Sequence, residues 1–203
     1  MMKEFMRIIA GSKRGKKLFE KVDTVTRPTT DRVRENVFNV LAGLVDLRGA
    51  RVLDLFAGCG SYGLESYSRG AAEIVFCDAD KAACEVIKQN CKAIGLVIPS
   101  PTCIQGRGIS GTHKATLCYG GVVLNLDYKL ALEKLKSQKF DVIFLDPPYQ
   151  SDFALQSLKL IQKQNMLSEN GIIVIESEQE LDLPFVKSKK YGRARVYFLA
   201  FDA

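Results

Sequence analysis

Short apolar runs alternate with segments of helical periodicity from about residue 31 to residue 201, and this alternation constrains the fold more than any other feature. Runs such as 51–56 and 140–145 have the continuous apolar character of strands buried on both faces. Strands that alternate with helices form a parallel sheet with helices on both faces. We therefore predict an α/β domain with a mostly parallel sheet, whose ligands bind at the carboxyl ends of the strands.

The periodicity also predicts where each element lies. Predicted strands cover residues 6–10, 51–56, 73–77, 122–125, 140–145, 172–176 and 196–201. Predicted helices cover about 31–44, a segment that ends at Arg69, and about 80–94, 127–137 and 153–166. Residues 96–120 show no clear period and are predicted to be an insert. A chain of 203 residues fits one domain, 1–203.

Several classes of protein are disfavoured by composition. No apolar run approaches the roughly 20 residues that a membrane span requires. The N-terminus lacks the apolar core of a secretory signal, so we expect a cytoplasmic protein without membrane association. The chain has one histidine, His113, and no Cys-x-x-Cys pair, so we predict no metal site and no serine or cysteine hydrolase triad.

Positive charge is concentrated at the N-terminus. Residues 1–34 contain ten Lys or Arg and four Asp or Glu, and this excess equals the formal net charge of +6. The other 19 basic and 19 acidic residues cancel. A basic extension over 1–28 is either a polyanion-binding element or a solvated mobile arm. The predicted contacts to nucleic acid are Lys13, Arg14, Lys16, Lys17, Arg32 and Arg34, and residues 187–195 form a second basic stretch.

A glycine-rich turn follows the strand at 51–56. Gly58-x-Gly60-x-x-Gly63 formally matches a dinucleotide fingerprint, which alone is a weak signal, and a plain tight turn is the simplest alternative. Asp54 precedes these glycines at the strand end, and an acid there suits a ligand with an ammonium group, such as the methionine part of S-adenosylmethionine. Asp78 ends the next strand, where a carboxylate can accept hydrogen bonds from ribose hydroxyls.

Two further acids follow strand ends. Asp80 is predicted to cap the following helix. Asp127, just after the strand at 122–125, is placed either to meet the adenine edge or to cap a helix, and both interpretations remain open.

The most specific motif is Asp146-Pro147-Pro148-Tyr149 at the end of the strand at 140–145. Two prolines fix the backbone and remove two donors, which makes a rigid shelf for the Asp146 carboxylate. An exocyclic base amine is a poor nucleophile because its lone pair is delocalised into the ring. A carboxylate and a carbonyl that accept its hydrogens localise that lone pair, and Tyr149 can stack on the extruded base. The alternative is a plain proline turn.

Taken together, these motifs resemble the RsmD-type family of bacterial methyltransferases, which act on a guanine N2 in 16S ribosomal RNA. The resemblance covers nearly the whole chain. Its motifs are Arg7-Ile-Ile-Ala-Gly11, Arg14-Gly-Lys-Lys-Leu18, Arg27-Pro-Thr-Thr-Asp-Arg-Val-Arg-Glu35, Asp54-Leu-Phe-Ala-Gly58, Gly63-Leu-Glu65, Ser68-Arg-Gly-Ala71 and Asp146-Pro-Pro-Tyr149. It implies a Rossmann-like class I S-adenosylmethionine-dependent methyltransferase that works in the cytoplasm on ribosomal RNA, within an assembling small subunit. We expect a monomer, because nothing in the sequence indicates a larger assembly.

The resemblance also implies roles for individual residues. The cofactor-binding set is Arg27, Thr29, Asp54, Phe56, Gly58, Gly60, Asp78 and Asp127, and the catalytic set is Asp146, Pro147, Pro148 and Tyr149. Cys59 stands where the family usually has serine, and the insert makes the spacing to Asp127 unusual. Three alternatives stay open: methylation of adenine N6 in DNA or RNA, RNA binding without catalysis and, more distantly, a dinucleotide oxidoreductase.

Overall fold

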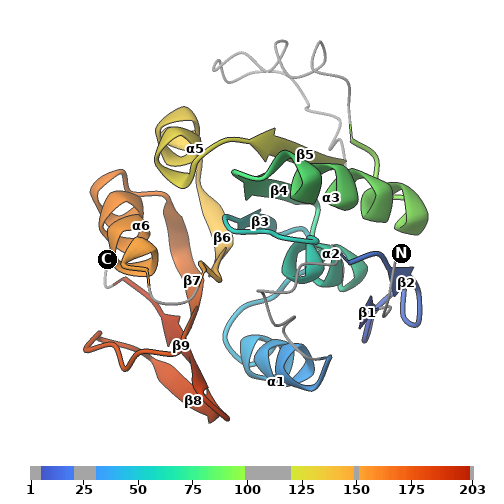
Figure 1. Cartoon of the computed structure of the whole chain (residues 1–203). Coiled ribbons are helices and arrows are strands. Elements are labelled where there is room, and N and C mark those ends of the chain that lie inside the picture. Colours follow the sequence, from blue (N-terminus) through green and yellow to red (C-terminus); the bar gives the residue numbers. More distant parts are fainter. Residues whose placement is uncertain (1–5, 21–30, 99–119, 149–150, 202–203) are drawn as a thin grey trace.

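A seven-stranded sheet with helices on both faces forms the centre of the computed structural model, which describes residues 6–20, 31–98, 120–148 and 151–201 (Figure 1). Its strands are β3 (Arg51–Asp54), β4 (Glu73–Asp78), β5 (Gly120–Asn125), β6 (Phe140–Leu145), β7 (Leu167–Ser177), β8 (Lys187–Tyr191) and β9 (Ala194–Leu199). The strand order is β5-β4-β3-β6-β7-β9-β8. The first five strands of that order are parallel, whereas β9 pairs antiparallel with both of its neighbours, β7 and β8. The predicted mostly parallel sheet is confirmed.

Two hydrophobic clusters lie on opposite faces of the sheet. The helices are α1 (Asp31–Leu41), α2 (Ser61–Ser68), α3 (Lys81–Ile94), α5 (Tyr128–Leu135) and α6 (Phe153–Lys163). Successive strand residues alternate between the clusters, so Val52 packs with α1, α2 and α3 whereas Leu53 packs with α5 and α6. The burial on both faces explains why the central strands are continuous apolar runs in the sequence. No helix in the described part of the chain is long and apolar enough to span a membrane.

The predicted elements differ from the structure mainly at the edges. β8 was missed, because its sequence, Lys-Ser-Lys-Lys-Tyr, was interpreted only as a basic stretch. Lysines on an edge strand are a known protection against unwanted strand pairing. β7 begins five residues before the predicted strand, at Leu167, and its register with β6 shifts between Phe140 and Val142. The predicted insert lies almost wholly outside the described residues.

The N-terminal extension contains a small hairpin rather than one strand over residues 6–10. β1 (Met6–Arg7) pairs antiparallel with β2 (Lys17–Leu18), and the turn between them carries two glycines with positive φ, Gly11 and Gly15. Figure 1 shows the hairpin next to α2 and away from β8 and β9. The described part of the extension is therefore a packed element.

Candidate active site

Three predicted acids end neighbouring strands of the sheet. β3 lies between β4 and β6, and Asp54 is in register with Phe76 of β4 and Phe144 of β6. Asp78 ends β4, and Asp146 directly follows β6. Because all three strands are parallel, their carboxyl ends meet at one edge of the sheet. The topology thus brings the predicted cofactor acids and the predicted catalytic acid to the same edge.

Asp54 is a buried carboxyl with an unusual pKa. Its side chain is 2% exposed and Oδ2 accepts a hydrogen bond from the Gly63 amide at 3.0 Å. Burial raises the pKa of Asp54 from 3.8 to about 7, the Gly63 amide opposes that rise, and the charge of Asp78 adds to it. A group that is half protonated near neutral pH gains from a cationic partner, because a positive charge favours the carboxylate.

The glycine loop is hydrogen-bonded to Asp78, and the space next to Gly58 is open. The Gly58 amide donates to Asp78 Oδ2 at 2.8 Å, and the Asp80 amide donates to Asp78 Oδ1 at 2.8 Å. Gly58 has φ +55°, and a Cβ atom built there would meet nothing within 4 Å. The loop therefore has room for a ligand against its backbone at Gly58.

The other two glycines of the motif face the interior. Gly60 has φ +82° and is the N-cap of α2. A Cβ atom on Gly63 would lie 2.3 Å from Phe76 Cε1, so this glycine is required for close packing of α2 on the sheet. The motif thus serves helix packing as well as the loop, and the cofactor role of Gly60 stays a prediction.

Asp127 and Asn125 form hydrogen bonds at the end of β5. Asp127 is the N-cap of α5 and its Oδ1 accepts from the Lys129 amide at 2.9 Å, so the capping interpretation is confirmed. An adenine-side role for Asp127 stays a prediction. Asn125 was missed, and its Nδ2 donates to the carbonyls of Asp78 and Ala79 at 3.1 and 3.0 Å. A polar residue that ends an apolar strand was the available signal.

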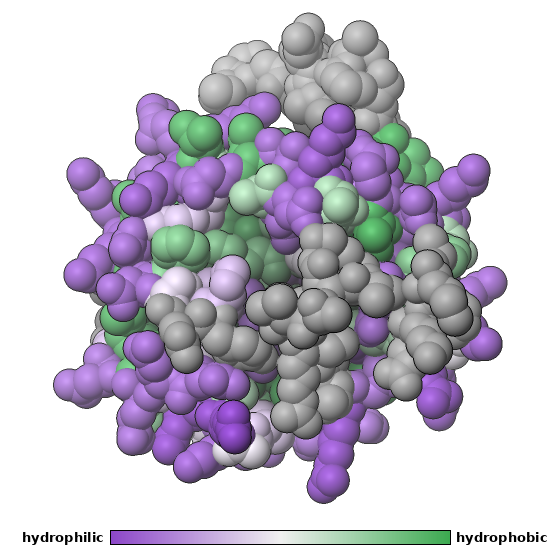
Figure 2. All heavy atoms as spheres, viewed as in Figure 1, coloured by the Kyte–Doolittle hydropathy of each residue, from purple (hydrophilic) through white to green (hydrophobic). Residues whose placement is uncertain are grey.

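Aromatic rings gather where α5 and α6 begin. The rings of Phe56 and Phe153 are 6.4 Å apart and nearly parallel, and Tyr128 lies 5.5 Å from Phe56 and 5.1 Å from Phe153. Phe153 is 38% exposed. In Figure 2, hydrophobic side chains are visible between α5 and α6 over the end of β6. Only Phe56 of this group was predicted, and it now has two aromatic neighbours at the same edge.

The proline motif ends β6 beside a buried tyrosine. Asp146 is half-buried, Pro147 is buried and Pro148 is exposed. The Tyr62 hydroxyl donates to Glu176 Oε2 at 3.1 Å, and the Tyr62 ring stacks on Phe144 with centroids 4.7 Å apart. Burial, followed by the charges of Glu176 and Asp146, raises the pKa of Tyr62 well above 10. Tyr62 and Glu176 were both missed by the sequence analysis.

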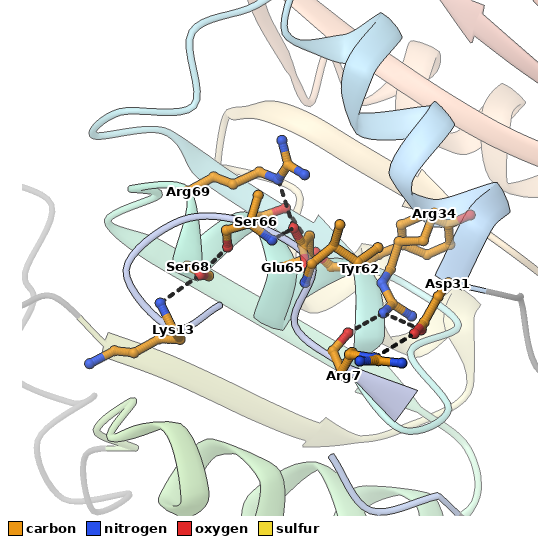
Figure 3. A network of polar contacts seen from close by, with 11 residues as sticks. Arg7, Lys13, Asp31, Arg34, Tyr62, Glu65, Ser66, Ser68 and Arg69 are labelled. Atoms are coloured by element: carbon orange, nitrogen blue, oxygen red, sulfur yellow. Dashed lines mark hydrogen bonds and ion pairs between the residues drawn. The ribbon is translucent and has the colours of Figure 1, made fainter. Parts of the chain in front are cut away.

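The basic hairpin is held against α2 by buried polar groups. Glu65 is fully buried, and its two carboxylate oxygens accept from the Ile9 and Ala10 amides at 2.8 and 3.0 Å. Ser68 accepts from the Lys13 amide at 2.9 Å, and Arg69 donates to Glu65 at 2.8 Å (Figure 3). Lys16 and Arg14, in contrast, are exposed. The described hairpin is therefore docked, which argues against the mobile-arm interpretation.

Arg34 does not lie at the surface as predicted. Its side chain is 0% exposed, and Nη2 donates to the Arg7 carbonyl at 2.5 Å and to Asp31 Oδ1 at 2.9 Å (Figure 3). Arg34 also contacts Met6 Sδ. This burial contradicts the prediction that Arg34 contacts RNA, because its guanidinium instead joins α1 to the hairpin. Arg32 and Lys17 are exposed, and their RNA role stays a prediction.

Some predicted site residues cannot be placed. Arg27, Thr29 and Tyr149 lie outside the described residues. Within the described ranges, no group of three or more His, Cys, Asp or Glu side chains is arranged to hold a metal ion.

Comparison with known proteins identifies the family. The family model described as "Conserved hypothetical protein 95" matches residues 6–200. The chain belongs to this family. YlbH of Bacillus subtilis is 38% identical, over 88% of this chain and 86% of its own. Ribosomal RNA small subunit methyltransferase D of Haemophilus influenzae is 32% identical, over 88% of this chain and 81% of its own. The resemblance to the RsmD-type family is thus confirmed.

Solved structures agree on the fold of this family member. A hypothetical protein of Thermus thermophilus matches with a TM-score of 0.75 at 27% identity, over 97% of this chain and 99% of that one. The 16S rRNA N2 methyltransferase RsmC, from the same species, matches with a TM-score of 0.66 at 19% identity, over 97% of this chain and 49% of that one. The fold is the Rossmann-like class I methyltransferase fold.

Proposed function

We propose that this chain is an S-adenosylmethionine-dependent methyltransferase that modifies the exocyclic N2 of a guanine in small-subunit ribosomal RNA, with residues 1–203 acting as one domain. Its Haemophilus influenzae relative is named a small-subunit rRNA methyltransferase. The observation that carries the proposal is the shared sheet edge, where the Asp146-Pro-Pro turn follows β6 next to Asp54 and the open loop at Gly58. Guanine N2 as the target follows from the family resemblance.

The residues present fit S-adenosylmethionine. The open space at Gly58 allows close approach of a ligand to the loop backbone, and the buried Asp54 carboxyl suits the ammonium group. We assign Asp78 to the ribose hydroxyls, and Phe56 and Asp127 to the adenine side. The bound sulfonium would supply an activated methyl group, so the protein needs neither a metal nor a covalent nucleophile for this transfer.

Asp146 is assigned to the amine of the base. Its carboxylate accepts one N2 hydrogen, which orients the lone pair toward the methyl carbon. The bound cofactor would supply the activated methyl group, and Asp146 would take the N2 proton that the amine loses on methylation. The Pro147-Pro148 shelf holds this geometry, and Tyr149 is assigned to stack on the extruded base.

The hairpin is assigned to the RNA. Lys13, Arg14, Lys16 and Lys17 stand on an element that is docked to α2, so their charges are presented at a defined place. Such contacts bind phosphate without reading sequence. A partly assembled small subunit is the proposed substrate, with the enzyme acting as a monomer in the cytoplasm.

Methyl transfer from labelled S-adenosylmethionine tests the proposal, with small subunits, free 16S rRNA and DNA as parallel substrates. We expect transfer to RNA by the wild type and a loss of about 10²- to 10⁴-fold in Asp146→Asn, with cofactor binding retained. Asp152→Asn is the matched control, since Asp152 is an exposed acid six residues on without a side-chain capping bond. Methyl transfer to DNA alone would support an adenine N6 methyltransferase. Cofactor-independent RNA binding without methyl transfer would support an RNA-binding protein without catalytic activity.

A further inference from the structure

Two carboxylates lie side by side on adjacent strands at the proposed base site. Leu145 of β6 is in register with Ile175 of β7, so the next residues, Asp146 and Glu176, are strand neighbours. Val174 and Phe144 belong to the hydrophobic cluster on the α1, α2 and α3 face, and the strand alternation places Glu176 and Asp146 on that same face. Both acids therefore lie at the place where the target base is assigned.

Glu176 is buried in an aromatic environment. It is 6% exposed, and its Oε2 accepts from the Tyr62 hydroxyl at 3.1 Å. Tyr62 is itself stacked on Phe144, the residue two before Asp146. Burial raises the pKa of Tyr62, the charges of Glu176 and Asp146 add to that rise, and the charge of Arg34 opposes it, so all three charged groups act on the phenol.

The hydrogen bond from Tyr62 does not by itself require a charge on Glu176. A glutamine would accept the same hydrogen bond from Tyr62 at a much lower desolvation cost. A second carboxylate on the adjacent strand adds like-charge repulsion, which costs further free energy in a buried environment. Paired acids of this kind are characteristic of functional sites. The arrangement therefore points to a ligand with hydrogen-bond donors.

The edge of guanine has the matching donors. Guanine presents its N1–H next to the N2 amine, whereas adenine presents an acceptor at N1 next to its N6 amine. We propose that Glu176 accepts the N1–H of the target guanine while Asp146 accepts an N2 hydrogen, so that Glu176 selects guanine over adenine. This inference rests on the proposed guanine N2 activity. An adenine in the same place would set its N1 lone pair against a carboxylate, and that repulsion is the basis of the selection.

The test uses RNA in which the hydrogen-bonding pattern of the target base is changed. The target nucleotide is first mapped by mass spectrometry of RNA methylated by the wild type, and then replaced by 2-aminopurine, which keeps the amine but has an acceptor at N1. Initial rates on both RNAs are compared for the wild type, Glu176→Gln and Tyr62→Phe. The comparison across variants cancels the missing O6 atom of the analogue.

We expect Glu176→Gln to lower the rate on guanine and to reduce the preference for guanine over 2-aminopurine at least about tenfold, because the amide can donate to N1. Tyr62→Phe should keep the preference, with both variants folded by circular dichroism. An unchanged preference in Glu176→Gln would overturn the inference and leave the proposed function standing. An equal loss in Tyr62→Phe would also overturn it, since packing would then be responsible. Failure of the wild type to methylate any RNA would overturn both proposals.

Discussion

At the scale of single residues, Asp54 links the fold to ligand binding. Its burial, and the Gly63 amide that bonds it, follow from the packing of α2 on the sheet. The folded-state pKa of about 7 lies above the ordinary value of 3.8, so the folded protein holds a proton that the unfolded chain releases. Asp54 therefore favours folding most below about pH 4, and this contribution is lost as the pH rises through 7.

Binding of S-adenosylmethionine is expected to release a proton from Asp54. The ammonium group favours the carboxylate, so its pKa falls on binding, and at pH 7 about half a proton leaves per ligand bound. Calorimetric titration in buffers of different ionisation enthalpy measures that number directly. Asp54→Asn should bind more weakly and release correspondingly less. Equal proton release by the wild type and Asp54→Asn would contradict the assignment of the ammonium group to Asp54.

Residue identities predicted the acids at the strand ends but not their partners. Asp54, Asp78 and Asp146 were predictable, because an acid after an apolar strand is a strong local pattern. Tyr62 and Glu176 were not, since they meet only when β7 is placed beside β6. Arg34 was misplaced for the same reason: nothing local distinguishes a surface arginine from one whose guanidinium is enclosed by a hairpin and α1.

At the scale of elements, central strands and helices were predictable and edges were not. β3, β4 and β6 are buried on both faces, so their sequences are continuous apolar runs. β8 is an edge strand and carries three lysines in five residues, a composition that does not differ from that of a polar loop. The hairpin strands are two residues each, and its stability comes from contacts with α2 rather than from its own sequence.

Removal of Glu65 is expected to detach this hairpin. Glu65→Ala leaves the Ile9 and Ala10 amides and Arg69 without their acceptor in a largely buried place, which should cost about 2–4 kcal/mol. Thermal unfolding and limited proteolysis near residues 6–20 measure the two consequences. Glu85→Ala is the matched control, since Glu85 is an exposed helix acid paired with Lys88. Equal protease resistance of the two variants would refute the docking role.

At the scale of the whole molecule, the net positive charge is unevenly distributed. The N-terminal residues account for the net charge of +6, and the remainder of the chain is balanced. The hairpin lies beside α2, whereas exposed lysines of α5 and α6 lie across the sheet (Figure 1). A docked cluster of cations gives a fixed direction to the electrostatic attraction, so we expect RNA to be drawn to one side of the molecule. The carboxyl edge with Asp146 can then receive a base from RNA already held.

This arrangement predicts a salt dependence that differs between two sets of lysines and arginines. Replacing Lys13, Arg14 and Lys16 by alanine should reduce the slope of log affinity against log salt by about 2, because each lost phosphate contact on single-stranded RNA removes about 0.7. The control replaces Lys134, Lys159 and Lys163, which are exposed on α5 and α6 and remove the same charge. RNA binding is measured by filter retention between low and physiological salt. If charge alone attracted the RNA, both triple variants would lose the same slope. If the docked hairpin holds the RNA, only the first variant loses it, and cofactor affinity is unchanged in both.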